Sequence, residues 1–359
     1  MRVVAAPDSF KGSIGAAGAA AALAAGWRSV RPGDEVLELP LADGGEGTVD
    51  VLAAAVTGSR RHFAEVSGPG EGRVTASWLE IPGNEHVIEL ASAAGLMLLR
   101  PLQPLRAHSY GVGELVGHAL DAGARRVLIA LGGSACTDGG SGALAALGAR
   151  FLDRDGRELP RGGAALTRLA RVDLRRLRPV PELGAACLTD VRAPLLGPAG
   201  AAAVFGPQKG AGPADIELLD AGLARLADLL AGDPQTPGAG AAGGAGYGLA
   251  AGWGATLLRG AAEIAAIAGL PAALARADLV ITGEGQYDAT SLSGKVAGTV
   301  LALASEAGVP AALVAGVVAA PPTVPAVELA SLAGGRDQAM AQAGRWLAEA
   351  GRELAAVTT

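Results

Sequence analysis

Residues 1–13, MRVVAAPDSFKGS, carry the pattern that decides the fold. Residues 3–6 form a short apolar run typical of a buried strand, which Pro7 and Asp8 end. Ser13 is placed to cap the Ala-rich segment that extends to about Trp27 and has the composition of a helix. The stretch therefore predicts a strand, a polar loop and a helix in succession.

The strand, loop and helix pattern repeats immediately. Residues 36–39 have the pattern of a strand, residues 40–45 that of its loop and residues 46–56 that of a helix. Glu46 would lie in the first turn, where a negative charge interacts favourably with the helix dipole. Two consecutive units of this kind predict a parallel sheet with its ligand site at the carboxyl ends of the strands.

The pattern changes beyond residue 60. Residues 61–67, 73–81 and 86–91 are extended segments separated by Gly and Pro turns, which is typical of an antiparallel or mixed sheet. Buried-strand patterns return later, at residues 278–282 and 311–315. With 359 residues, the chain is long enough for two domains.

We therefore predict an α/β fold with two domains. A Rossmann-like or flavodoxin-like parallel-sheet domain is expected to comprise residues 1–65 and 285–359. A mixed-sheet α/β domain, residues 66–284, is expected to be inserted in it. The active-site cleft is expected between the two domains.

The composition excludes several classes of protein. A net charge of −6 disfavours binding to nucleic acid or to an anionic membrane surface. Two cysteines are too few for a disulfide framework or a four-cysteine zinc site. Glycines and prolines interrupt the charge-free residues 234–258 and 308–327, so neither stretch predicts a membrane helix. We expect a cytoplasmic protein with small-molecule partners, and a homo-oligomer is compatible with the sequence.

Lysine is almost absent, and its three positions share one context. Among 29 Lys and Arg residues, only Lys11, Lys209 and Lys295 are lysines, and each lies next to a glycine in a short polar segment. A lysine ammonium is a compact charge that can bind a single phosphate oxygen. These positions suggest phosphate binding, and the alternative is that they are ordinary surface lysines.

Glycines and carboxylates also gather at five predicted strand ends. Glycine lets backbone N–H groups approach an anionic oxygen, and a carboxylate can bind Mg²⁺ or accept a proton. Each loop alone is equally compatible with a tight turn, but together they favour a site for small anions, metal and proton transfer. The loops are residues 8–9 (DS), 42–48 (ADGGEGT), 132–134 (GGS), 189–190 (TD) and 282–285 (TGEG).

No Walker A motif accompanies these loops. Such a motif ending at Gly294 and Lys295 would need glycine at position 289 and Ser or Thr at position 296. The chain has Ala289 and Val296 at these positions, so phosphate binding must use another arrangement.

Six motifs occur in a fixed order along the chain. They are residues 6–12 (APDSFKG), 40–48 (PLADGGEGT), 91–96 (ASAAGL), 109–115 (SYGVGEL), 205–211 (FGPQKGA) and 283–285 (GEG), the last followed by Asp288 and Lys295. Together they resemble the type I glycerate kinase family of bacteria. Each motif is short, but their order and spacing make a chance match improbable, and the resemblance extends from residue 3 to beyond residue 330.

The resemblance implies an ATP-dependent kinase. Its expected reaction is the phosphorylation of D-glycerate, mainly to 2-phosphoglycerate rather than 3-phosphoglycerate, in glyoxylate and glucarate utilisation. It also implies a two-domain α/β structure with one domain inserted in the other, and ATP and Mg²⁺ as cofactors. Two alternatives remain: a kinase for another small hydroxy acid, and a non-catalytic sensor of glycerate or a sugar acid.

Candidate catalytic and phosphate-binding residues follow from position and charge. Phosphoryl transfer needs aligned reactants and neutralised phosphate charge, so Lys11 is the first candidate for the transferred phosphate, with Asp8 beside it. Asp190 follows an apolar strand, where partial burial would raise its pKa, and it is the candidate base for the glycerate hydroxyl. Further candidates for ATP or phosphate are Lys209, Lys295, Gly283 and Gly285.

Candidate metal and substrate residues come from the same loops. Asp43, Glu284 and Asp288 are the candidates for Mg²⁺ or its waters. Ser9 and Arg192 are candidates for the carboxylate of the substrate. The other candidates for substrate binding are Asp43, Gly44, Gly45 and Ser134.

The chain departs from the family pattern at several positions. Family members usually have a basic residue where this chain has Gln286. If that basic residue contacts phosphate or the substrate carboxylate, its replacement would weaken binding or shift specificity. They also usually carry other residues at His108, Thr137, Thr189 and Ala193. These departures bear on the identity of the substrate more than on phosphoryl transfer itself.

Overall fold

The computed structural model describes residues 1–358, the side chain of Ser293 excepted. The chain forms two compact units. The first comprises residues 1–43, 50–57 and 259–359, and the second comprises residues 44–49 and 58–258. The chain therefore leaves the first unit and returns to it twice.

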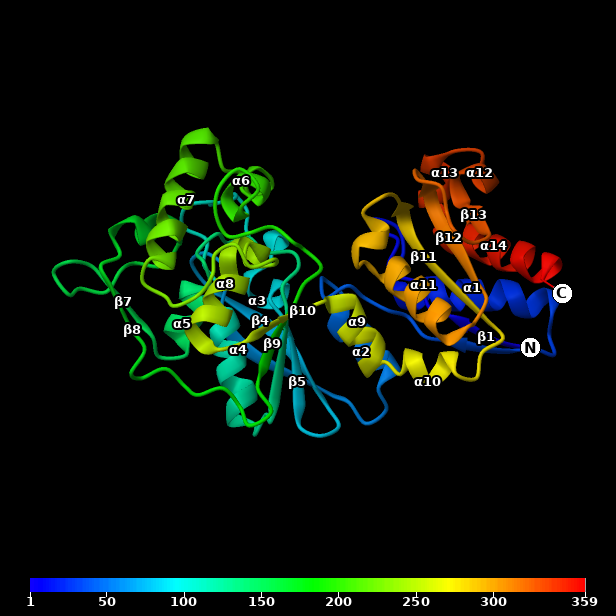
Figure 1. The fold of residues 1–359 in the computed structure, drawn as a ribbon, viewed down its shortest axis with the longest axis horizontal. Coiled ribbons are helices and arrows are strands. Elements are labelled where there is room, and N and C mark those ends of the chain that lie inside the picture. The colour runs from blue at the N-terminus through cyan, green and yellow to red at the C-terminus, as the bar shows by residue number, and fades with distance from the viewer. Residues whose placement is uncertain (359) are drawn as a thin grey trace. The chain divides into compact units, whose positions relative to one another are not determined.

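The first unit contains a five-stranded parallel sheet (Figure 1). Its strands, in spatial order, are β13 (Ala326–Glu328), β12 (Ala311–Val318), β11 (Leu279–Tyr287), β1 (Arg2–Ala5) and β2 (Glu35–Glu38). Counted along the chain within this unit, the order is 5-4-3-1-2, which is the flavodoxin-like doubly wound arrangement. The strand order reverses between β1 and β11, and a ligand site is expected at such a switch point.

Helices cover both faces of the parallel sheet because successive strand side chains point to opposite faces. Val3 and Ala5 lie in a core with α1 and α14, whereas Val4 and Ala6 lie in a separate core with α9 to α11. The helices of this unit are α1 (Ala16–Val30), α9 (Gly260–Ile267), α10 (Leu270–Leu274), α11 (Val296–Ala307), α12 (Leu329–Ala333), α13 (Arg336–Ala341) and α14 (Ala343–Val357), with a 3-10 turn at η4 (Ser291–Ser293). Helix α2 (Thr48–Ala55) crosses the division between the units, and its residues 50–55 belong to this one.

The second unit is built on a six-stranded mixed sheet. In spatial order, its strands are β10 (Thr256–Leu258), β9 (Ala185–Leu188), β6 (Arg126–Ala130), β5 (Glu85–Glu89), β4 (Arg73–Ile81) and β3 (Arg60–Ser67). The first four are mutually parallel, and β4 is antiparallel to both of its neighbours. A separate hairpin pairs β7 (Arg150–Leu152) with β8 (Arg171–Asp173).

The helices of the second unit pack on its sheet and share a large hydrophobic cluster with it. None of the helices within residues 1–358 combines the length and apolar character needed to cross a membrane. The helices of this unit are α3 (Ala91–Ala94), α4 (Tyr110–Asp121), α5 (Ser141–Ala146), α6 (Ala201–Phe205), α7 (Pro213–Ala227) and α8 (Ala241–Trp253), with 3-10 turns η1 (Leu96–Leu98), η2 (Gly163–Arg168) and η3 (Pro207–Lys209).

The structure confirms the predicted α/β class with a parallel and a mixed sheet. The units, however, divide at other points than the predicted 65/66 and 284/285 boundaries. β3 belongs to the mixed sheet because it pairs with β4 along its whole length, and position 284 lies inside β11, in the middle of the parallel sheet.

Two predicted helix starts differ from the structure. α1 begins at Ala16, and Ser13 does not cap it, because its Oγ donates instead to the carbonyl oxygen of Phe10 at 2.8 Å. α2 begins at Thr48, and Glu46 lies outside it. Gly47 has a φ of 90°, a left-handed conformation that cannot continue a right-handed helix.

Candidate active site

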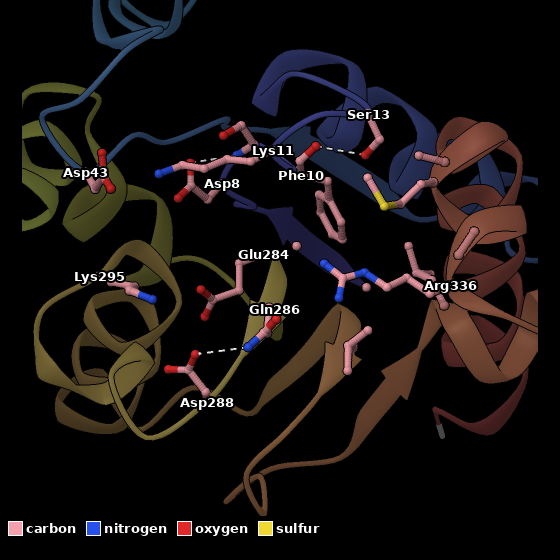
Figure 2. Close-up of a pocket in the computed structure, with 18 residues that line it drawn as sticks. Asp8, Phe10, Lys11, Ser13, Asp43, Glu284, Gln286, Asp288, Lys295 and Arg336 are labelled. Atoms are coloured by element: carbon pink, nitrogen blue, oxygen red, sulfur yellow. Dashed lines mark hydrogen bonds between the residues drawn. The ribbon is translucent and has the colours of Figure 1, made fainter. Parts of the chain in front are cut away.

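A cavity of about 330 Å³ opens at the switch point of the parallel sheet, where β1 and β11 end (Figure 2). All of its lining residues belong to the first unit. Its polar side chains include most of the residues predicted to bind phosphate and metal. These polar lining residues are Asp8, Ser9, Lys11, Ser13, Asp43, Glu284, Gln286, Asp288, Lys295 and Arg336.

The loop after β1 is fixed against β11 by the backbone. The N–H group of Asp8 donates to the carbonyl oxygen of Gly283 at 2.8 Å. The N–H group of Ser9 donates to Oδ1 of Asp8 at 2.6 Å, which turns the chain directly after the strand. The loop then closes on itself through the antiparallel bridge between Phe10 and Ile14. Hydrogen bonds therefore hold the loop with Asp8, Ser9 and Lys11 in a defined position after the carboxyl end of β1.

The glycines of β11 allow close packing of its backbone. A Cβ on Gly283 would lie 2.3 Å from the carbonyl oxygen of Val314 on β12. Opposite Gly285, a Cβ on Gly316 would lie 2.4 Å from the carbonyl oxygen of Gly285. Gly283 thus serves strand packing, while Gly285 lines the cavity. Of these two candidates for phosphate binding, only Gly285 faces the ligand space.

Carboxylates crowd the centre of the cavity and perturb one another. Burial, with the neighbouring charges of Asp43 and Glu284, raises the pKa of Asp8 to about 7, against the smaller effects of the Ser9 N–H group and Lys11. Burial also raises the pKa of Glu284, which the Ser291 hydrogen bond and Lys295 partly offset. Carboxylates that repel each other in a buried site are stabilised by a bound cation.

Glu284 carries the clearest mark of a missing ligand. Its side chain is 6% exposed, and among the described residues no hydrogen-bond donor meets its Oε1 atom. A buried carboxylate oxygen without a partner is costly, so such an atom in a cavity indicates a donor or a cation from outside the chain.

The donor set fits Mg²⁺ but not a cation held by protein atoms alone. In the described part of the chain, no three His, Cys, Asp or Glu side chains converge as a metal site. Mg²⁺ usually keeps several waters and is bound by one or two carboxylates together with substrate phosphates. Glu284, Asp8 and Asp43, which interact electrostatically, can supply such carboxylates.

The two lysines of the cavity balance these carboxylates. Lys11 lowers the pKa of Asp8, and Lys295 lowers that of Glu284. Lys295 is also the residue that precedes α11, so its side chain starts where the helix exposes its first N–H groups. Both lysines are thus close enough to the central carboxylates to meet a phosphate bound there.

Asp288 lies at the cavity but is engaged in a turn. Its Oδ1 atom accepts hydrogen bonds from the backbone N–H and the hydroxyl group of Thr290, at 2.8 and 2.5 Å. These bonds lower the pKa of Asp288. Gln286 donates weakly to its Oδ2 atom at 3.4 Å. Asp288 is therefore a weaker candidate for a metal ligand than Glu284.

Part of the cavity wall was not predicted from the sequence. Arg336, on α13, points into the cavity, and apolar side chains surround that end (Figure 2). Apart from Phe10, which lies in the motif of residues 6–12, no motif marks this region, because its residues come from β12 and from α12 to α14. The apolar lining residues are Phe10, Val317, Leu329, Ala339, Met340 and Ala343.

The remaining predicted site residues belong to the second unit. Gly44 and Gly45 precede α2, and Ser134 follows β6. These loops pack together closely, since a Cβ on Gly132 would lie 2.4 Å from the Cα atom of Gly45. The structure thus brings Gly44, Gly45 and the 132–134 loop to one place.

Asp190 and Arg192 lie after β9, the parallel neighbour of β6. The carboxyl ends of neighbouring parallel strands lie at the same edge of a sheet, so the Asp190 loop and the Ser134 loop are adjacent there. Asp190 is half-buried and Arg192 is exposed. The N–H group of Val191 donates to Oγ1 of Thr189 at 3.2 Å, which shapes the turn between them.

Lys209 does not line the cavity at the β1/β11 switch point. It is 1% exposed, and its Nζ atom donates to Oγ of Ser134 at 2.9 Å and to the carbonyl oxygen of Cys136 at 2.5 Å. Burial lowers its pKa to about 8. These contacts indicate that Lys209 supports the Ser134 loop from inside the unit, a role that its polar, glycine-flanked sequence did not reveal.

Buried Asp138 supports the same loop, although no sequence pattern singled it out. Its Oδ2 atom accepts hydrogen bonds from the N–H and hydroxyl groups of Ser109, both at 2.8 Å, and from the N–H group of Gly142 at 3.2 Å. Its Oδ1 atom accepts from the N–H group of Gly140 at 3.1 Å. The chain after Ser134 is therefore fixed by a buried carboxylate.

Comparison with known proteins gives a consistent picture. The family model described as the glycerate kinase family matches residues 3–359. The chain is 44% identical to a glycerate kinase of Bacillus subtilis over 88% of this chain and 85% of that protein. It is 42% identical to a glycerate 2-kinase of Escherichia coli over 82% of this chain and 80% of that protein.

A solved structure is similar along almost the whole chain. It comes from Salmonella typhimurium LT2, carries the provisional name glycerate kinase 2 and is 40% identical in sequence. The match has a TM-score of 0.86 and covers 99% of this chain and 97% of the other.

Proposed function

Because the chain belongs to the glycerate kinase family and is a kinase, we propose that it transfers the γ-phosphoryl group of ATP to the 2-hydroxyl group of D-glycerate. The observation that carries this proposal is the cavity at the β1/β11 switch point, where two lysines face a cluster of carboxylates. Cations neutralise phosphate oxygens, and carboxylates hold the Mg²⁺ that accompanies ATP.

Lys11 and Lys295 are proposed to bind the phosphates. A lysine about 4 Å from a phosphate oxygen contributes an attraction of roughly 4 kcal/mol in a partly screened site, before the cost of desolvation. Both lysines already interact with the central carboxylates, which places them near the charge that must be neutralised. Gly285 lines the same wall of the cavity.

Glu284 is proposed as the principal ligand of Mg²⁺, with Asp8 and Asp43 as its neighbours. When bound, Mg²⁺ supplies positive charge to the phosphate oxygens and orients them for transfer. The unpartnered Oε1 atom of Glu284 supports this assignment. Asp288 is proposed to act through the turn that it forms with Thr290.

Asp190 is proposed as the base that accepts the proton of the glycerate hydroxyl group. It follows a fully buried strand and lies beside the Ser134 loop, against which Gly45 packs, and this group of loops is proposed to bind the small polyol acid. Arg192, two residues further on, or Ser9 would bind the carboxylate of the substrate. The 2-hydroxyl group and its proton therefore meet the base, while the carboxylate sets the orientation.

Steady-state kinetics with Mg-ATP tests the proposal. We expect the highest kcat/KM for D-glycerate in a panel that includes tartronate and other small hydroxy acids, and loss of turnover after removal of Mg²⁺ by EDTA. Asp190→Asn keeps the size of the side chain and is expected to lower kcat much more than it raises KM. A higher kcat/KM for another hydroxy acid would identify that acid as the preferred substrate. An unchanged kcat in Asp190→Asn would show that Asp190 is not the base.

A further inference from the structure

The cavity has two chemically different ends. Lys11, Asp43 and Lys295 lie toward one end, and Arg336 extends from α13 at the other (Figure 2). Around Arg336 the wall is apolar, with Phe10 and Met340 as its largest side chains. The two ends therefore select different parts of a ligand.

D-Glycerate does not account for the apolar end. All of its carbon atoms carry oxygen, so an apolar wall would remove water from its polar groups without replacing their hydrogen bonds. The cavity, of about 330 Å³, also lies in the range of sites for ligands much larger than a three-carbon acid. A ligand that is polar at one end and has a flat apolar group at the other fits both features.

Arg336 adds a positive charge to the cavity that no described residue of the chain pairs with. Its side chain is exposed, and among the described residues no hydrogen bond or ion pair engages its guanidinium group. Figure 2 shows the guanidinium group directed from α13 toward Glu284 and Gln286, that is, toward the middle of the cavity. A planar guanidinium group binds phosphate through two parallel hydrogen bonds.

We propose that the apolar end binds the base of the nucleotide and that Arg336 binds its phosphate chain, which then runs past Gly285 toward Lys11 and Lys295. This assignment rests on the proposed function, because it takes ATP as the phosphoryl donor. Met340 contacts the base through a polarisable thioether, which packs well on aromatic rings. The nucleotide thus lies along the carboxyl ends of β11 and β12, with its reactive end at the carboxylates.

The experiment measures binding without turnover, by calorimetry with ADP and with tripolyphosphate, both in Mg²⁺. Met340→Gln preserves length and charge but makes the wall polar, and we expect it to weaken ADP binding about fivefold and to leave tripolyphosphate unchanged. Arg336→Ala is expected to weaken both ligands about tenfold. Both side chains are exposed, so the variants should fold normally.

Two matched variants serve as controls. Met97→Gln changes a methionine of the other unit that is also exposed, and Arg345→Ala removes an exposed arginine that stacks on Trp346 outside the cavity. Neither is expected to change the affinity for ADP or tripolyphosphate. A change in either control equal to that in its partner variant would count against a specific site.

Several outcomes would overturn the inference. Unchanged ADP binding in both Met340→Gln and Arg336→Ala would overturn it. Weaker binding of D-glycerate, with unchanged binding of tripolyphosphate, in Arg336→Ala would also overturn it, because the arginine would then bind the acid. Wild-type protein that binds ADP as expected but phosphorylates no glycerate would instead refute the proposed function alone. Active wild-type protein whose variants bind ADP normally would refute the inference alone, and absence of ADP binding would refute both.

Discussion

The three lysines show how one sequence context can lead to different environments. Lys11 and Lys295 line the cavity and interact with Asp8 and Glu284, whereas Lys209 is buried and bonded to Ser134 and Cys136. Each lies beside a glycine in a polar segment, so the sequence could not separate them. What separates them is the packing of distant segments around each loop.

Lys11→Ala tests the role of the exposed lysine. If its ammonium group neutralises the transferred phosphate, kcat/KM should fall by about 10² to 10³, the loss typical of removing one electrostatic contact to a transition state. Initial-rate kinetics with Mg-ATP and D-glycerate measures the change, and Arg345→Ala serves as the surface control. Wild-type kinetics in Lys11→Ala would return this residue to the class of ordinary surface lysines.

Lys209 makes a distinct prediction for the pH dependence of stability. Burial lowers its pKa from 10.5 to about 8 in the folded chain. Below pH 8 both the folded and the unfolded chain carry the proton on Lys209. Folding then buries the full positive charge, which lowers the free energy of unfolding. Between pH 8 and 10.5 only the unfolded state keeps the proton, so the free energy of unfolding rises with pH, by about 3 kcal/mol in total.

Comparison with Lys209→Met isolates this effect. Urea unfolding at pH 7.5, 9 and 10.5 gives the free energy of unfolding of both proteins. The difference, wild type minus variant, should increase with pH across this range because the methionine has no proton to release. A difference that stays constant with pH would show that Lys209 keeps its usual pKa in the folded protein.

Close helix packing depends on glycine at the contact of α1 and α14 (Figure 1). A Cβ on Gly26 would lie 1.9 Å from the carbonyl oxygen of Ala348, and one on Gly351 would lie 2.4 Å from that of Leu23. Real Cβ atoms do not approach backbone oxygens so closely, so any side chain at these positions would separate the helices. The loop that leads from β1 to α1 lines the cavity. A change in how α1 packs would therefore also disturb the site.

Gly26→Ala is therefore expected to lower the free energy of unfolding by about 1 to 3 kcal/mol, the cost of overpacking a well-packed contact. Gly33→Ala is the matched control, because a Cβ there meets nothing within 4 Å and its φ is not positive. Denaturant unfolding measures both variants. Equal stability of Gly26→Ala and Gly33→Ala would contradict the close packing.

At the level of elements, the sequence predicted most strands well and their arrangement only in part. The apolar run at residues 3–6 marked β1 to within one residue, because burial on both faces leaves a continuous apolar signal. Helix starts were less accurate, since the positive φ of Gly47 cannot be seen in the letters. The position of β11 beside β1 is set by pairing between segments far apart in the sequence, such as Val3 with Leu279.

The same distinction applies to the site. The sequence could place Asp8, Lys11 and Asp43 after β1 and β2, and Glu284 and Lys295 in the segment of β11 and α11. A parallel sheet brings the carboxyl ends of its strands together, and these residues therefore line one cavity. Arg336 and Met340 could not be placed in this way, because no local pattern distinguishes them from other residues of short surface helices. Their position depends on how α13 packs beside β12.

At the scale of the whole molecule, each unit contains hydrophobic clusters of its own. One core holds the helices and sheet of the second unit, and the clusters of the first unit share no residue with it. Trp27 and Trp346 belong to the first unit, and Trp78 and Trp253 to the second. Each unit thus has its own source of stability and its own fluorescent reporters.

Separate cores predict two unfolding transitions rather than one. Differential scanning calorimetry of the wild type should show two components, and Gly26→Ala should lower the midpoint of only one. Replacing Trp78 and Trp253 by phenylalanine leaves fluorescence from the first unit alone, which should follow the component shifted by Gly26→Ala. A single transition that shifts as a whole would show that the units unfold cooperatively.

The family and the kinase class predicted from the motifs are confirmed by the match to residues 3–359 and by the similar glycerate kinases. The central claim is the reaction itself. Phosphorus NMR of the protein incubated with Mg-ATP and D-glycerate tests it most directly, because the product signal distinguishes the two hydroxyl groups. Our account predicts 2-phosphoglycerate together with ADP. A signal from 3-phosphoglycerate, or no phosphorylated acid from protein that binds both ligands, would contradict it.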